Sequence, residues 1–166
     1  MSRDLRAGDG TGPLAPLRPV ILIVDDDPGI RESFRLILEE RYELVEAGDG
    51  RQAIEIVRTS EVDLVLLDIR LPEMDGIEVL ERIKALDEQV EVILVTAVKT
   101  VRTAVAAMKL GAFDYITKPF EEDDLLSVIG RALEKRSLER EVVFLRTGSL
   151  GPAGAPPSST EMMWSF

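Results

Sequence analysis

The chain has 166 residues, with 31 acidic and 20 basic side chains, a net charge of −11, and neither cysteine nor histidine. This length fits one domain of ordinary size with tails, and the missing residue types exclude disulfides, thiolate or imidazole metal sites and a phosphohistidine relay within the chain. A bound metal would therefore be a hard cation held by oxygen ligands. The acidic charge is a poor match for nucleic acid, and no apolar run approaches the roughly 18 residues of a membrane span.

The first half of the chain predicts a tail followed by alternating strands and helices. Residues 1–18 are rich in glycine, proline and arginine without periodicity, and are expected to be disordered. Val20–Val24 is a short, continuous apolar run that is typical of a strand buried on both faces. A helix is expected from Pro28, because proline suits the first turn of a helix. Tyr42–Ala47 and Gln52–Arg58 predict the next strand and helix.

The second half continues the same alternation. Strands are predicted at Leu64–Leu67, Val92–Val95 and Tyr115–Thr117, with helices at Ile77–Leu86 and Val101–Leu110. Gly111 is a suitable helix C-cap. A long final helix is expected to begin after Phe120 and to continue to about Leu145, followed by a disordered linker at 147–166.

Five such alternations predict an α/β fold with a doubly wound, five-stranded parallel sheet. The expected architecture is flavodoxin-like (βα)5, in three α/β/α layers, because continuous apolar strands indicate a sheet covered by helices on both faces. The predicted organisation is one sheet domain at 19–136 with a helical extension at 137–146. Ligands in such folds bind at the carboxyl ends of the strands.

Polar side chains with compatible chemistry follow four of the predicted strands. They are Asp25–Asp27, Asp68, Thr96 and Lys118. Several carboxylates at one sheet edge would repel one another strongly without a cation. Two aspartates of the first strand and Asp68, with the backbone carbonyl of Arg70, therefore predict a Mg²⁺ site.

This arrangement also predicts a chemical reaction. Asp68 can act as a nucleophile that forms an acyl phosphate, while Lys118 and Thr96 contact the phosphoryl oxygens. Each residue alone has an ordinary explanation: an aspartate after a strand as a helix cap, an acidic run as a solvated cluster, a threonine or Lys-Pro as part of a turn. Their joint occurrence at one sheet edge favours the functional interpretation.

Four segments, ILIVDDDP, LVLLDIRLPEMDG, VILVTA and GAFDYITKPF, resemble the receiver domain of bacterial two-component response regulators. The resemblance covers about Pro19 to Leu133. It implies Asp25 and Asp26 as an acidic pair, Mg²⁺ contacts from Asp26 and Asp68, Asp68 as phosphoacceptor, Thr96 and Lys118 as phosphoryl-sensing residues, Tyr115 as an aromatic switch and a cis bond before Pro119. It also implies a cytoplasmic protein that is phosphorylated by a sensor histidine kinase or a phosphotransfer protein and that is not otherwise an enzyme.

The segment TAVAAMKLGAFDYITKPF is especially similar to NtrC-type receivers, and ALEKRSLEREVVFLR resembles their linker helix. The chain has no Walker A motif and no helix-turn-helix, so a stand-alone or truncated receiver is expected. Leu138, Val142 and Leu145 form a short apolar stripe, which is typical either of a homodimer seam or of a frayed helix end. Arg136, Glu139, Arg140 and Glu141 are expected to flank it, as charges flank a coiled-coil seam.

Two other functions use the same residues. A haloacid-dehalogenase-like phosphatase would use Asp25 as nucleophile, but that family places threonine or valine where this chain has Gly29. A dimerisation module that acts without phosphorylation would not respond to a phosphoryl donor. Two local expectations concern the loops: Asp27 should point away from the metal as a cap or a solvated residue, and Gly76 should adopt a positive φ.

Overall fold

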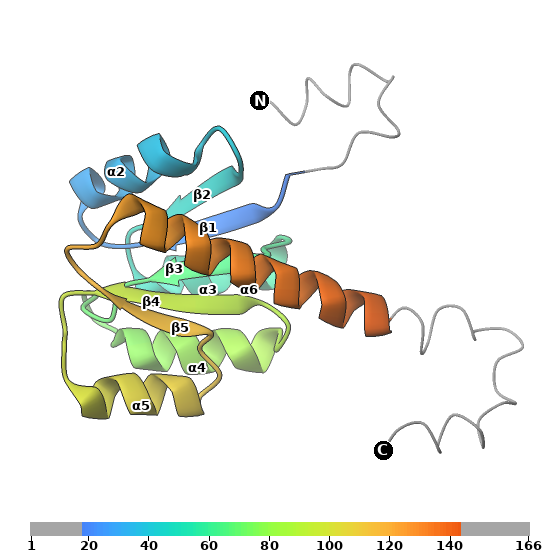
Figure 1. Cartoon of the computed structure of the whole chain (residues 1–166). Helices are drawn as coiled ribbons and strands as arrows, with labels where there is room; N and C mark the ends of the chain where they lie inside the picture. The colour runs from blue at the N-terminus through green and yellow to red at the C-terminus, as the bar shows by residue number, and fades with distance from the viewer. Residues whose placement is uncertain (1–17, 144–166) are drawn as a thin grey trace, which may run out of the picture.

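The computed structural model describes residues 18–143 and shows one five-stranded sheet with helices on both faces (Figure 1). All strand pairs are parallel, in the order β2-β1-β3-β4-β5. The strands are β1 (Val20–Val24), β2 (Glu43–Ala47), β3 (Leu64–Leu67), β4 (Glu91–Thr96) and β5 (Asp114–Thr117). The helices are α2 (Pro28–Leu38), α3 (Gly50–Thr59), α4 (Gly76–Leu86), α5 (Val101–Lys109) and α6 (Glu122–Val143). The predicted doubly wound α/β fold is confirmed.

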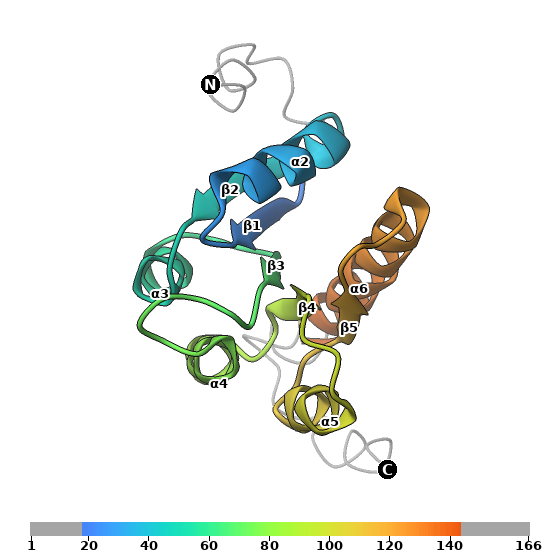
Figure 2. The ribbon, with the colours of Figure 1, turned by 90° about the vertical axis from the view of Figure 1, so that its left-hand side faces the viewer.

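Two hydrophobic clusters, one on each side of the sheet, form the core. Figure 2 shows α3, α4 and α5 on one face of the sheet and α2 and α6 on the other. Alternate residues of β1 serve the two clusters: Leu22 and Val24 pack with the first group of helices, and Ile21 and Ile23 with the second. Because every residue of this strand is buried, its sequence is a continuous apolar run.

Side-chain caps set several of the helix ends. The Asp27 carboxylate accepts a hydrogen bond from the Gly29 N–H at 2.8 Å and caps α2, as expected. Asp49, Asp75 and Thr100 cap the next three helices in the same way. The C-cap of α5 is Leu110, one residue before the expected Gly111. Gly111 follows the cap with a φ of 105°, the left-handed conformation that glycine commonly supplies just after a helix.

Ion pairs with Asp63 and the buried Glu91 anchor the second half of α6. The Arg136 guanidinium is only 6% exposed, and it donates to Asp63 at 2.9 Å and to the Gln89 carbonyl at 2.6 Å. Lys135 pairs with the buried Glu91 at 3.0 Å. The expectation that Arg136 flanks a coiled-coil seam is therefore wrong, because this side chain is buried against Asp63 and the Gln89 carbonyl.

The last turns of α6 continue past the sheet edge at which the strands begin (Figure 1). The helix crosses the predicted boundary at 136 without a break. Leu138 is 56% exposed, whereas the Val142 side chain, Leu145 and most of the two predicted tails lie outside the described residues. Among residues 18–143, no helix has both the length and the apolar character that crossing a bilayer requires.

Candidate functional site

The sheet register brings the predicted site residues to one edge. Val24 pairs with Leu67, so Asp25 and Asp68 both come directly after the ends of adjacent strands. Thr96 ends β4 opposite Thr117, and the Lys118 N–H donates to the Thr96 carbonyl at 2.9 Å. The carboxyl ends of β1, β3, β4 and β5 therefore meet as the sequence predicted.

Lys118 joins the two central aspartates directly. Its ammonium group lies 2.8 Å from Asp25 Oδ2 and 3.0 Å from Asp68 Oδ2. Asp25 is 2% exposed and Asp68 is 8% exposed, so one partly buried cation serves two buried carboxylates. Sequence reasoning assigned Lys118 only to the phosphoryl group and missed this pairing, which the long separation along the chain conceals. The peptide bond between Lys118 and Pro119 is cis, as the resemblance implied.

The pKa values of Asp25 and Asp68 are shifted in opposite directions by their surroundings. Burial raises the pKa of Asp25 above its ordinary value, and the contact with Lys118 only partly opposes this. Burial also acts to raise the pKa of Asp68, but hydrogen bonds from the Arg70 N–H, Lys118 and Thr96 outweigh it, so this pKa is lowered. Burial acts to lower the pKa of Lys118, yet the two carboxylates raise it. Asp68 is therefore held as a carboxylate, the form that a nucleophile requires.

Thr96 and Tyr115 both contact the loop between β4 and α5. Thr96 is fully buried, and its hydroxyl oxygen accepts the Val98 N–H at 3.3 Å. The Tyr115 hydroxyl donates to the Val98 carbonyl at 2.6 Å. Both side chains thus contact one loop residue, Val98.

The donor atoms at this edge of the sheet are carboxylate and carbonyl oxygens, the chemical type that a hard divalent cation prefers. Asp26 is exposed and lines an open hollow of about 680 Å³ together with Arg70 and the rest of residues 69–75. The Arg70 N–H donates to Asp68 Oδ1 at 3.0 Å, so the Arg70 backbone lies beside the Asp68 carboxylate. Within residues 18–143, no three acidic side chains are grouped closely enough to hold a metal ion. The Lys118 ammonium occupies the position between Asp25 and Asp68, and Asp26 lies on the exposed side of the same strand end.

Gly76 has a different role from the one expected. Its φ is not positive; the positive φ of this loop belongs to Glu73, at 64°. A Cβ atom on Gly76 would lie 2.5 Å from the Asp68 carbonyl oxygen and 2.5 Å from Ile69 Cα. The Gly76 N–H donates to the Ile69 carbonyl at 2.8 Å. Glycine is therefore required because the start of α4 packs directly against the backbone that carries Asp68.

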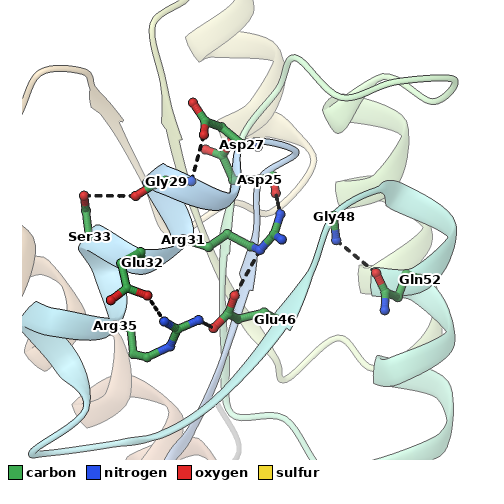
Figure 3. Close-up of polar contacts among 10 residues, drawn as sticks. All are labelled: Asp25, Asp27, Gly29, Arg31, Glu32, Ser33, Arg35, Glu46, Gly48 and Gln52. Carbon is green, nitrogen blue, oxygen red and sulfur yellow. Dashed lines mark hydrogen bonds and ion pairs between the residues drawn. The ribbon is translucent and has the colours of Figure 1, made fainter.

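Sequence reasoning also missed Arg31 and Glu46. Arg31 Nη1 donates to the Asp25 carbonyl at 2.6 Å, and its Nε donates to Glu46 at 3.0 Å (Figure 3). Glu46 also pairs with Arg35. The available signal was a charged residue inside a predicted strand, together with an arginine one helical turn after the acidic run.

Comparisons with known proteins agree with this geometry. Residues 21–130 match the response regulator receiver domain family. The chain is similar to regulatory protein AtoC of Escherichia coli K12, with 41% identity over 75% of this chain and 27% of AtoC. It is 40% identical to sporulation initiation phosphotransferase F of Bacillus subtilis, over 70% of this chain and 95% of that protein.

A solved structure of NtrX from Brucella abortus in complex with ADP has a TM-score of 0.73 and 37% identity, over 79% of this chain and 30% of NtrX. The chain thus spans less than a third of AtoC and of NtrX. The family match covers most of the described residues, and the relatives include NtrC-type regulators. The chain belongs to the response regulator receiver domain family of two-component systems, and its receiver is NtrC-like.

Proposed function

We propose that this receiver is a phosphorylation-dependent switch that accepts a phosphoryl group on Asp68 from a partner histidine kinase or phosphotransfer protein. The observation that carries the proposal is the pairing of Asp68 and Asp25 with one ammonium group, that of Lys118. It holds a nearly buried aspartate in its ionised form at the carboxyl edge of a parallel sheet. The proposed location is the cytoplasm, and the role applies equally to a stand-alone receiver and to a receiver from a longer NtrC-type regulator.

In the proposed reaction, an Asp68 carboxylate oxygen attacks phosphorus while the bond from phosphorus to the donor breaks. Lys118 is within reach of the Asp68 oxygens and can follow the added charge, because its ammonium is a compact cation on a flexible stem. The Thr96 hydroxyl, which already stabilises the Asp68 carboxylate, can donate to a phosphoryl oxygen.

Mg²⁺ is the proposed cofactor, with Asp25, Asp26, Asp68 and the Arg70 carbonyl as its protein ligands. When bound, it would neutralise charge on the phosphoryl group and orient that group for in-line attack. The donor chemistry supports this, since Mg²⁺ favours a few carboxylates with water and phosphate oxygens in the remaining positions.

The first prediction concerns labelling by a small phosphodonor. Acetyl phosphate with Mg²⁺ is expected to phosphorylate the chain, and excess chelator is expected to abolish the reaction. Asp68→Ala should remove labelling, whereas Asp27→Ala should retain it, because Asp27 serves as the cap of α2. Intact-mass spectrometry measures all four conditions. Equal labelling of wild type and Asp68→Ala would refute the assignment.

The second prediction concerns the route from Asp68 to the surface. Thr96→Ala is expected to accept phosphate but to transmit it poorly, because the variant loses the hydroxyl that links Asp68 to Val98. Moving a two-state equilibrium from mostly off to mostly on takes about 5.5 kcal/mol, of which one hydrogen bond to a charged group supplies about 1.5–3 kcal/mol. Loss of that bond should therefore leave switching incomplete.

Amide chemical shifts of the loop between β4 and α5 report this coupling. Thr96→Ser is the matched control because it keeps the hydroxyl. Phosphodonor-induced shifts in this loop should be small in Thr96→Ala and close to wild type in Thr96→Ser. Full-size shifts in Thr96→Ala would contradict the proposed route.

The alternative functions make different predictions at the same residues. A phosphatase would use Asp25 as nucleophile, but that carboxylate is 2% exposed and has a raised pKa, which disfavours it. A module that acts without phosphorylation would leave the loop unchanged by a phosphodonor. A homodimer through α6 stays a prediction, for which exposed Leu138 is the described member of the apolar stripe.

A further inference from the structure

One arginine of α2 contacts the backbone of the acidic segment instead of its carboxylates. Arg31 Nη1 donates to the carbonyl oxygen of Asp25 at 2.6 Å. Its Nε donates to Glu46 Oε1 at 3.0 Å, from the edge strand β2. Figure 3 shows Arg31 between these two partners. The side chains of Arg31 and Glu46 are 20% and 25% exposed, so the network is largely shielded from water.

This contact fixes the peptide unit that joins the two acidic residues. Asp25 ends the regular pairing of β1, where its own N–H donates to the Ala47 carbonyl at 3.2 Å. Its carbonyl oxygen is then held by Arg31. Because a peptide unit is planar, holding this oxygen also sets the direction of the Asp26 N–H and restricts how the Asp26 side chain leaves the backbone.

We propose that Arg31 is a positioning residue for the metal site: by holding the Asp25 carbonyl, it aims the Asp26 carboxylate toward the cation. The inference rests on the proposed function, because it gives Asp26 a role as a Mg²⁺ ligand. Arg31 acts through the backbone and contacts neither the phosphoryl group nor its acceptor.

Glu46 gives Arg31 the charge balance that this role requires. A bare guanidinium beside the acidic pair would compete with a divalent cation for the carboxylates. Pairing with Glu46 offsets that charge and draws the guanidinium fork toward β2. Burial acts to raise the pKa of Glu46, but hydrogen bonds from Arg35 and Arg31 outweigh it, so the pKa is lowered and Glu46 stays ionised at neutral pH.

The same network contains an internal control. Arg35 also pairs with Glu46, and its other partner is Glu32 on the same helix. Arg35 and Arg31 therefore share one charge partner, Glu46. The hydrogen bonds of Arg35 go to side chains of α2 and β2, whereas Arg31 also donates to the Asp25 carbonyl. A purely structural helix–strand contact would make the two arginines equivalent, whereas a positioning role applies to Arg31 alone.

The test measures Mg²⁺ affinity by isothermal titration calorimetry in the absence of any phosphodonor. Arg31→Met retains much of the apolar stem and removes the donors, and it is expected to raise the Kd for Mg²⁺ by about tenfold, as loss of an outer-shell partner typically does. Arg31→Lys should give an intermediate Kd, because one ammonium group cannot hold both partners as the guanidinium fork does. Arg35→Met should keep the Kd within about twofold of wild type.

Urea unfolding of each variant separates affinity from stability. The expected result is a similar loss of stability in Arg31→Met and Arg35→Met, with a change in Kd only in the former. An unchanged Kd in Arg31→Met, or an equal rise in both variants, would overturn the inference. If Arg31→Met does not fold, a wild-type Kd in Arg31→Lys overturns it instead. A wild-type chain that binds no Mg²⁺ and accepts no phosphate would instead contradict the proposed function itself.

Discussion

Replacement of Lys118 by methionine is expected to lower the free energy of unfolding by about 3 kcal/mol at neutral pH, because it leaves two buried carboxylates without their cation. Asp25 and Asp68 both lie within 3.0 Å of the ammonium group. The expected loss of about 3 kcal/mol is the smallest that is typical of a broken buried ion pair, because the Lys118 side chain is 20% exposed. Saturating Mg²⁺ should return part of the lost stability, because a divalent cation can take over the neutralisation.

The stability difference between the wild type and Lys118→Met is expected to depend on pH in a definite direction. In the wild type, the pKa of Asp68 is lowered, so its contribution to stability is present above the ordinary carboxylate pKa and is lost as pH falls through the lowered value. In Lys118→Met, burial without a cation should raise the pKa of both aspartates, so acid should favour the folded state. The stability difference between the two proteins should therefore shrink as pH falls below neutral.

Urea unfolding between neutral pH and the carboxylate range, with and without Mg²⁺, measures this difference. Arg58→Met is the control, since within residues 18–143 Arg58 pairs only with exposed Glu55 on the same helix. This variant should show no measurable loss of stability. A loss of stability in Lys118→Met that stays constant across the pH range would contradict the proposed pairing.

Gly76→Ala is expected to destabilise the fold by about 3 kcal/mol, because the added Cβ meets backbone atoms that cannot move aside cheaply. The contacts would be 2.5 Å to the Asp68 carbonyl oxygen and 2.5 Å to Ile69 Cα. Relief of this clash would displace α4 from the end of β3, so phosphorylation of Asp68 should also slow.

Gly130→Ala is the matched control for this substitution. Gly130 lies in α6, and beyond its own helical turn a Cβ there would meet no described atom within 4 Å. Alanine should therefore stabilise the helix by about 0.5–1 kcal/mol. Thermal unfolding of the two variants should show shifts of opposite sign. A Gly76→Ala protein as stable as the wild type would exclude the close backbone approach.

The fold was predictable because its strands are buried on both faces. The predicted bounds of β1 and β3 are the observed ones, since each is a continuous apolar run that ends at an aspartate and begins after a proline or an aspartate. At β4 the prediction began one residue late because Glu91 is charged, although this residue is buried and paired with Lys135 of α6. That pairing joins residues 44 positions apart, so local sequence could not reveal it.

The residues of the site were predictable as a group, but their mutual contacts were not. The topology of the sheet places Asp25, Asp68, Thr96 and Lys118 at one edge, and this placement does not depend on the conformations of their side chains. The bridge from Lys118 to two aspartates and the hold of Arg31 on a carbonyl depend on side-chain directions that only tertiary packing sets. Gly76 shows the same limit: its glycine signal was read correctly as a backbone constraint but assigned to φ instead of a close approach.

Identification of the phosphorylated residue tests the central proposal most directly. The chain is treated with acetyl phosphate and Mg²⁺, the acyl phosphate is reduced with borohydride, and the modified aspartate is located by peptide mass spectrometry. The account predicts modification at Asp68, at the end of β3, and not at Asp25 or Asp26. Modification at Asp25, or a chain that remains unmodified although it is folded and supplied with Mg²⁺, would contradict the account.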